Sequence, residues 1–573
     1  MNQRVPWENS EEFLIMYKKN VPEAVARYRE IIKMFALYNS WPESRKRGIL
    51  TKFETLSHQM DFHCTELVQC FVKINFYTIP IDMLENFVQF LSKIATIHVG
   101  HTTSILVHFV AYLVPLIDDN VKSGISTPSN ENQEKMFSLI HKSIQDILNC
   151  NPLSGNILVK LLSSQFPFYR KSGKVISGYV KNLITVMSYS KFIKVDIFNV
   201  LIEKLVGLDI CVANENVIEM KNGFLLNSIF TLAINNCEVK TKYAKEFPPL
   251  GNDNLSGTLD LCLLFLLDYI SQPFEIKIQD SDNNEINWGE CFVRNTDSNL
   301  AALMMPSFIQ HVVPHFGLKN VPFLYFYACG IHPSSRTTIL SELWVLFLNN
   351  QAVNTNNIAH NACFYLSDLI TRLENFSIST CVKVLREMAN WIHEYIGRYD
   401  DSNCEKTAGC PQHSCFYVIV QSMLYIFCYR YREFVDSDYL EDIAKLNVSK
   451  IIFCSLHPME FIDPEISVSF AVVAKLLQLE YCSHLITSSS RTKAIFETQF
   501  PFSSLNLPQC SRYFEKYFRH FEPIEEDTSI LIDSINASFQ SVKSCRVDET
   551  SMMEEYMFLD EGDNITNNFA LNF

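Results

Sequence analysis

Hydrophobic residues recur between Val321 and Ile396 with the spacing of one helix face. Residues at i, i+3, i+4 and i+7 lie on the same side of a helix, so repeated runs of this pattern predict three helices in a row. The apolar sets are Ile339, Leu340, Leu343, Trp344, Phe347 and Leu348, then Ala362, Leu366, Leu369, Ile370 and Leu373, and then Cys381, Leu385, Met388, Ile392 and Tyr395. Short polar segments precede each set and offer the side chains that begin helices. Two helices and a short turn in roughly forty residues are typical of an α-solenoid.

The helical period extends over most of the chain and is interrupted by polar stretches. We expect N-terminal helical repeats over 1–117, a polar linker over 118–133, helical repeats over 134–270, a polar loop over 271–299, C-terminal helical repeats over 300–521 and an acidic tail over 522–573. Pro167 is expected to end the helix before it, because proline lacks an N–H and its ring clashes with the preceding turn. The polar stretch from Asp209 to Asn222 predicts a loop. Phe416 to Tyr431 is apolar on all sides and predicts a helix at the centre of the fold.

The composition favours an all-α protein. Of 573 residues, 48% are hydrophobic, and there are only 16 glycines and 21 prolines. This leaves little room for an architecture of strands and tight turns, or for glycine-rich phosphate loops. The fold class predicted from the sequence is therefore a HEAT-like helical repeat superhelix, with an acidic C-terminal tail that is partly disordered.

The formal net charge of −15 is unevenly distributed. Residues 522–573 hold 12 acidic and two basic residues, so the tail carries −10 of this charge. Neither the tail nor the body suits the neutralisation of phosphates, which dominates non-specific DNA affinity. A role at DNA would therefore run through protein partners, without direct sequence-specific DNA binding. Within the tail, Glu554 to Asp563 (E-E-Y-M-F-L-D-E-G-D) combines acidic and apolar residues, as do segments that order only on a partner.

The cysteines and the apolar runs predict a buried core in a reducing compartment. Most of the 18 cysteines sit inside apolar runs and none forms a C-x-x-C pair, which favours small buried hydrophobes over disulfides or redox motifs. Ile97 to Ile117 contains three histidines, and Cys415 to Tyr429 is short and holds polar residues, so both are expected to be buried helices, not membrane spans. Met1 to Glu30 is polar and charged and does not resemble a signal peptide.

The sequence signals no common reaction class, cofactor or metal. It contains no G-x-x-x-x-G-K-[ST], G-x-G-x-x-G, H-E-x-x-H or G-x-S-x-G motif. The best group of soft ligands comprises Cys404, Cys410, His413 and Cys415, but its spacing matches no standard zinc site. A loop with incidental cysteines is the preferred interpretation. The histidines at 98, 101 and 108 are expected to be packed or to lie at the rim, because no carboxylate partner is at hand. The tryptophans at 344 and 391 are expected to be core residues, because their neighbours at helical spacing are apolar.

Three sequence blocks resemble, in their order, a known family. The first holds F-P-F-Y-R-K-S (Phe166 to Ser172), G-Y-V-K-N-L and I-E-K-L-V-G-L-D (Ile202 to Asp209). The second holds F-L-Y-F-Y-A-C-G (Phe323 to Gly330), L-W (Leu343, Trp344) and N-W-I-H-E-Y-I (Asn390 to Ile396). The third holds F-P-F (Phe500 to Phe502) and R-Y-F-E-K-Y-F (Arg512 to Phe518). Together they are similar to RNA polymerase I-specific transcription initiation factors of the TIF-IA type.

The resemblance implies a nuclear and nucleolar protein that is not an enzyme. It would bind RNA polymerase I subunits and bridge them to the core promoter factor, the selectivity-factor complex, at ribosomal RNA genes. In that family the N-terminal half is implicated in docking the polymerase and is regulated by phosphorylation, and the proteins can self-associate, so a homodimer stays open. We expect the core factor to bind the C-terminal half. The residues alone also allow a generic α-solenoid adaptor in transport or tethering, or a helical enzyme with a novel site.

A basic cluster follows the F-P-F-Y motif. It comprises Arg170, Lys171, Ser172, Lys174 and Lys181. One interpretation is an ordinary solvated face. The other is a contact for an acidic partner that phosphorylation can cancel, because a phosphate on Ser172 would add about −2 of charge beside two cations. The family resemblance favours the second interpretation and makes this cluster the candidate polymerase-docking and phosphoregulated site.

Overall fold

The structure is a computed structural model that describes residues 10–79, 81–116, 130–223, 255–274, 299–352, 356–399, 408–435, 439–477, 479, 482 and 507–521. The chain divides into two compact units. Unit 1 contains Met1–Ile339 and Leu505–Lys516, and unit 2 contains Leu340–Ser504 and Tyr517–Phe573. The described residues are almost all helical and form no β-strand, which confirms the all-α helical repeat fold.

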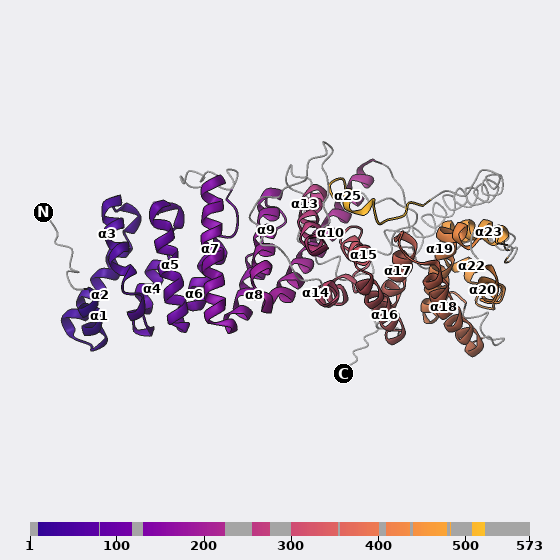
Figure 1. Ribbon diagram of the computed structural model, residues 1–573, viewed down its shortest axis with the longest axis horizontal. Coiled ribbons are helices and arrows are strands. Elements are labelled where there is room, and N and C mark those ends of the chain that lie inside the picture. Colours follow the sequence, from indigo (N-terminus) through magenta and orange to yellow (C-terminus); the bar gives the residue numbers. More distant parts are fainter. Residues whose placement is uncertain are drawn as a thin grey trace, which may run out of the picture. The chain divides into compact units, whose positions relative to one another are not determined.

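Unit 1 is a stack of helix pairs, and Figure 1 shows α3, α5, α7 and α9 side by side in chain order. The helices α3, α5, α7 and α9 pack on one another in succession, and α4, α6, α8 and α10 form a second row. The unit continues with α13, α14 and α15. The bounds are α1 Ser10–Lys18, α2 Pro22–Phe35, α3 Glu43–Glu54, α4 Thr65–Val72, α5 Ile81–Ile97, α6 Val99–Ala111, α7 Asn130–Cys150, α8 Gly155–Ser164, α9 Gly173–Tyr189, α10 Lys194–Gly223, α13 Leu255–Ser271, α14 Leu300–Ser307 and α15 Pro322–Ile331.

Unit 2 is organised around α19 (Ser414–Val435), which packs on α17, α18, α22 and α23. The prediction of a central helix over Phe416 to Tyr431 is confirmed, because nearly all of its side chains are buried. The other bounds are α16 Pro333–Asn349, which begins in unit 1, α17 Asn356–Arg372, α18 Ile378–Tyr399, α20 Leu440–Ala444, α21 Val448–Ile452, α22 Pro458–Phe461 and α23 Pro464–Leu476. Helix α23 begins with a side-chain cap: Pro464 fills the first position and the Asp463 carboxylate accepts the N–H of Glu465 at 2.8 Å.

Several details differ from the sequence predictions. Asp209 to Asn222 is not a loop, because α10 continues to Gly223 and Asp209 is buried within the fold. The polar linker ends before residue 133, since α7 begins at Asn130. Residues 321–396 hold four helices instead of three: α15 was missed because its apolar run covers only ten residues and shows no helical period. Trp344 and Trp391 are half-buried and not core residues.

One helix in the described part of the chain, Leu255–Phe274, is long and apolar enough to cross a membrane. Of that window, 61% is buried, and its helix α13 packs on α9, α10 and α15. Such burial is typical of the core helix of a repeat protein. Ile97 to Ile117, the earlier candidate, contains α6, whose buried residues include Ile105, Leu106 and Phe109.

His141 forms a buried polar network between α7 and α9. Its Nε2–H donates to Asn182 Oδ1 at 3.3 Å, and its Nδ1 accepts the Tyr189 hydroxyl at 3.1 Å. Asn182 in turn donates its amide N–H to the Leu113 carbonyl at 2.7 Å. Burial lowers the pKa of His141 from 6.5 to about 4, against the opposing effect of Asn182.

This network predicts acid lability of unit 1. The folded state favours the neutral imidazole, so the stability from His141 is full above pH 6.5 and is lost as the pH falls toward 4. The change corresponds to roughly 3 kcal/mol. We expect the urea midpoint to drop across this window, and His141→Gln to flatten part of the drop. The exposed His58→Gln variant is the control, and an unchanged slope in His141→Gln would contradict the prediction.

Candidate functional site

The turn between α8 and α9 holds the basic cluster and is fixed by its own aromatic residue. The Tyr169 hydroxyl donates to the Lys204 carbonyl of α10 at 2.9 Å, and the Lys171 N–H donates to the Phe168 carbonyl at 2.8 Å. Gly207 permits this approach, because a Cβ there would lie 2.3 Å from the Tyr169 hydroxyl. Pro167 is buried and follows the end of α8 at Ser164, as predicted. The F-P-F-Y part of the motif therefore anchors the turn on α10.

The anchored turn presents the charged part of the motif. Arg170, Lys171 and Lys174 are exposed, and Ser172 and Lys181 are half-buried. The structure brings four of these residues onto the turn and the first turn of α9. Lys181 lies seven residues after Lys174, two helical turns further along the same side.

Ser172 occupies the N-cap of α9, where its hydroxyl makes no capping hydrogen bond. The first turn of a helix carries unsatisfied N–H groups and a partial positive charge, which favour an anion. The positive charges of the basic cluster and of the helix terminus therefore act on the same place. Gly173 then packs closely on α13, because a Cβ there would lie 2.3 Å from the Thr258 hydroxyl oxygen. Chemically, this arrangement can attract carboxylates or a phosphate and contains no nucleophile–base pair.

The end of the first block connects α10 to the start of α15. The Asp209 carboxylate accepts the N–H groups of Asn320 and Val321, both at 2.9 Å. It also accepts the side-chain amide of Asn320 at 2.8 Å. Burial raises the pKa of Asp209, while these hydrogen bonds act in the opposite direction. The buried Asp209 side chain thus caps the start of α15. The sequence did not predict this role.

The second and third blocks meet on α15. Within the helix, the hydroxyls of Tyr325 and Tyr327 lie 2.7 Å and 2.6 Å from the hydroxyls of Ser307 and Ser271. These serines explain why two fully buried positions can be tyrosines. The residues Tyr513 and Phe514 of the R-Y-F-E-K-Y-F motif contact this helix, with 5.6 Å between the ring centres of Tyr327 and Tyr513.

The same C-terminal segment is held to α13 by Asp260, whose carboxylate accepts the N–H groups of Gln509 and Cys510 at 2.8 Å and 3.0 Å. Most motif residues that carry the family resemblance in unit 1 therefore hold neighbouring helices together. Arg170 and Lys171 of the first block differ from these residues, because their side chains are exposed.

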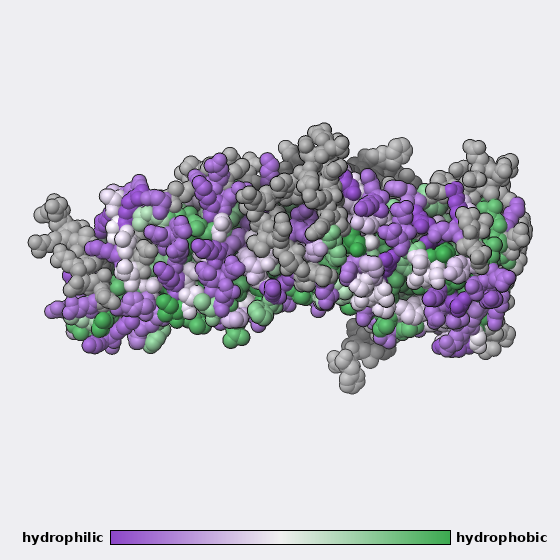
Figure 2. Space-filling view, viewed as in Figure 1, coloured by the Kyte–Doolittle hydropathy of each residue, from purple (hydrophilic) through white to green (hydrophobic). Residues whose placement is uncertain are grey.

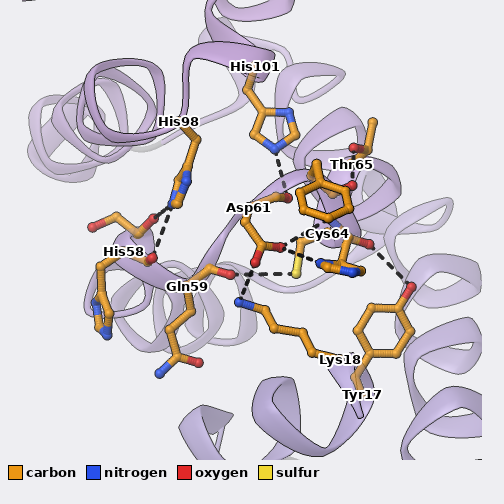
Figure 3. A network of polar contacts seen from close by, with 12 residues as sticks. Tyr17, Lys18, His58, Gln59, Asp61, Cys64, Thr65, His98 and His101 are labelled. Atoms are coloured by element: carbon orange, nitrogen blue, oxygen red, sulfur yellow. Dashed lines mark hydrogen bonds and ion pairs between the residues drawn. The ribbon is translucent and has the colours of Figure 1, made fainter. Parts of the chain in front are cut away.

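The other candidate sites of the sequence are structural where the chain is described. Figure 3 shows that His98 and His101 face the connection before α4. The Nε2 of His98 lies 3.1 Å from the His58 carbonyl, and that of His101 lies 3.0 Å from the Asp61 carbonyl. His108 is separate from this pair, and burial lowers its pKa to about 4. The imidazole of His413 is 2.8 Å from the Tyr395 hydroxyl, and Cys404 lies outside the described residues.

Comparisons with known proteins agree with the sequence resemblance. The family model for RNA polymerase I specific transcription initiation factor RRN3 matches residues 17–225 and 235–526. The chain belongs to this family. A Caenorhabditis elegans relative, named RNA polymerase I-specific transcription initiation factor tif-1A, is 24% identical over 96% of this chain and 88% of its own length. The mouse factor RRN3 is 23% identical over 67% of this chain and 58% of its own length.

A solved structure of RNA polymerase I transcription initiation factor Rrn3 has the same fold. It superposes with a TM-score of 0.63 at 16% sequence identity and covers 89% of this chain and 97% of its own. This likeness extends over both units and supports the repeat architecture of the family member described here.

Proposed function

We propose that this family member binds RNA polymerase I and bridges it to the promoter-bound core factor at ribosomal RNA genes. The observation that carries the proposal is the anchored basic cluster, placed in unit 1 among family motifs that otherwise serve the fold. A protein with a net charge of −15 that presents cations on a fixed turn has a defined surface for an acidic partner. Recruitment needs no catalysis: holding both partners raises their effective concentration.

The remaining parts of the proposal follow the family. The core factor, or selectivity-factor complex, would bind the C-terminal half, and a second copy of the chain would be a further partner. A polymerase I factor acts in the nucleus, and we place this one in the nucleolus. No cofactor enters the mechanism. A generic solenoid adaptor is the alternative function, and it would show cargo-type partners and a distribution outside the nucleolus.

The double variant Arg170→Glu/Lys171→Glu is expected to reduce polymerase I capture from nuclear extract at least tenfold. The reason is the reversal of two exposed charges on a turn whose anchor, Tyr169, is untouched. The matched control is Lys33→Glu/Lys52→Glu, which makes the same charge change at exposed positions of α2 and α3. Subunits are quantified by mass spectrometry. Equal capture by both double variants would contradict the docking site. If no bait captures polymerase I, the generic adaptor function is favoured.

Ser172→Glu is expected to weaken polymerase capture several-fold, because the added charge neutralises the basic cluster at the helix terminus. Ser172→Ala is expected to bind normally and to be as stable as the parent chain, since the hydroxyl makes no capping hydrogen bond. Capture assays and thermal unfolding are run in parallel. If alanine and glutamate weaken binding equally, the serine contributes as a contact and not as a charge switch.

A further inference from the structure

Unit 2 carries a row of stacked aromatic rings on α16 and α18. We call Trp344, Phe347, Trp391, Tyr395 and Tyr399 the aromatic row. Consecutive rings in this order have their centres 5.4 Å, 5.2 Å, 5.2 Å and 4.6 Å apart. The row therefore runs without a gap from one helix to the other, and all of its members belong to unit 2.

Most of the aromatic row reaches the surface. Phe347 is fully buried and forms the floor of the row, whereas the other four members are half-buried or exposed, with Tyr399 at 43%. Beside the row, Val345 and Leu348 are exposed on α16. In Figure 2 the region of α16 is coloured white and green, which marks weakly polar and hydrophobic side chains. Tryptophan and tyrosine are the residue types that most often dominate binding at a protein interface.

Two hydrogen-bond donors of the aromatic row are unused. Neither the Trp344 nor the Trp391 indole N–H donates to another residue in the part of the chain that the structure describes. The Tyr395 hydroxyl, by contrast, already lies 2.8 Å from His413 Nδ1. An indole can only donate, so an occupant that satisfies both tryptophans must bring carbonyl oxygens that are not already bonded within itself.

The charges that border the aromatic row cancel. On the side of α18 that carries Trp391, two carboxylates and two cations flank the row, namely Glu387, Glu394, Lys383 and Arg398. Glu394 and Arg398 pair at 2.7 Å. On α16, residues 343–349 contain no charged side chain, and Glu342 lies almost half a turn around the helix from Trp344. An uncharged occupant therefore fits this border better than an acidic or a basic one.

We propose that the aromatic row of unit 2 binds a proline-containing segment of a partner protein in the polyproline II conformation. This conformation has no internal hydrogen bonds, so its carbonyl oxygens are available to the two indole N–H groups. An α-helix or a paired strand has already used its carbonyls. Proline rings are uncharged and pack on aromatic rings, and the fixed φ of proline reduces the entropy that is lost on binding.

The spacing of the two tryptophans fits this occupant. Both indole rings adjoin the ring of Phe347, so they are at most about 11 Å apart, compared with about 9 Å between every third residue of a polyproline II helix. Prolines at positions i and i+3 can therefore contact both tryptophans. Tyr395 and Tyr399 continue the row for a further turn of the bound segment.

The test uses the full-length chain and a fluorescein-labelled peptide of ten prolines, with fluorescence anisotropy as the readout. The parent chain is expected to bind this peptide with a Kd on the order of 0.1 mM. Trp344→Ala/Trp391→Ala is expected to weaken binding at least tenfold. The control variant is Leu440→Ala/Phe453→Ala, which removes two other exposed apolar side chains of unit 2 and should leave binding unchanged. A ten-residue Gly/Ser peptide is the control for the probe.

A second variant separates the rings from their N–H groups. Trp344→Phe/Trp391→Phe keeps an aromatic ring on each side of Phe347 but removes both donors. It is expected to weaken binding several-fold and to leave the urea midpoint, followed by circular dichroism, unchanged. In the parent chain, the ten-proline peptide should slow hydrogen exchange over residues 340–349 and 384–399.

Four results would overturn the proposal. The first two are no binding of the ten-proline peptide to the parent chain, and equal binding by the parent chain and the alanine variant. The third is tighter binding of an amphipathic leucine–glutamine helical peptide, which would assign the row to a helix. The fourth is a change of oligomeric state in the tryptophan variants, which would assign it to a second copy. The polymerase-docking proposal concerns unit 1 and is independent of all four.

Discussion

Replacing Arg430 with leucine is expected to lower the free energy of unfolding of unit 2 by about 4 kcal/mol. Arg430 is only 1% exposed, and its guanidinium donates to the carbonyls of Ile370 and Phe376 at 3.0 Å and 2.7 Å. It also pairs with Glu433 at 2.6 Å. Leucine restores the packing volume in part but leaves these acceptors without their donor, and an uncompensated buried group costs more than the pair contributes.

The loss should be larger at neutral than at acid pH. Burial alone would raise the pKa of Glu433, but its contacts with Arg430 and Arg519 hold that pKa below its usual value. The stability from this carboxylate is present above its unfolded pKa and is lost as the pH falls. Hydrogen exchange over α17 and α19 in urea reports on unit 2, because tryptophan fluorescence would also include the three tryptophans of unit 1. Arg386→Leu, which removes an exposed pair with Asp442, is the control and should cost under about 1 kcal/mol.

Asp209→Ala is expected to destabilise unit 1 by about 3–4 kcal/mol. The variant leaves the buried N–H groups of Asn320 and Val321 and the Asn320 side-chain amide without their acceptor. It also removes a buried charge whose desolvation is costly, which offsets part of the loss. The effect should centre on the start of α15. Hydrogen exchange over residues 318–332 measures it directly.

The controls for Asp209 separate charge from hydrogen bonding. Asp209→Asn keeps one acceptor oxygen and should lose less than the alanine variant. Glu203→Ala, on the outer face of the same helix, should change stability by under about 0.5 kcal/mol. Exchange at residues 318–332 that stays slow in Asp209→Ala would show that the cap is dispensable.

The sequence predicted elements well where one helix face is apolar and the other is polar. The third predicted helix of the central stretch is α18, and its predicted apolar residues Leu385, Met388 and Ile392 are buried in the structure. Helix α15 escaped the pattern because its apolar run of ten residues is too short to separate a helix from a buried strand, whereas the longer apolar run of α19 predicted a helix. The loop predicted at Asp209 failed for another reason: a polar residue signalled solvent, although its partners lie more than a hundred residues away.

The sequence predicted where the candidate basic cluster lies, but not the contacts that anchor its turn. The charges of the basic cluster stand together in the sequence, so their gathering on one turn needed only the end of α8. Its anchor depends on Tyr169 meeting Lys204 and Gly207 on another helix, and only Gly207, a glycine inside a helical run, left any signal. Likewise, the half-exposure of Trp344 and Trp391 depends on neighbours that periodicity does not specify.

Unit 1 has a consequence for how the protein is made. Its last piece, Leu505–Lys516, is synthesised only after Leu340–Ser504, the larger part of unit 2. At about 5–20 residues per second, a ribosome needs roughly nine to thirty-five seconds between Ile339 and Lys516. During that interval Asp260 lacks its hydrogen-bond partner Cys510, and Tyr327 of α15 lacks its contact with Tyr513. A nascent chain of this family member should therefore depend on chaperones, and a message truncated before Leu505 yields two incomplete units.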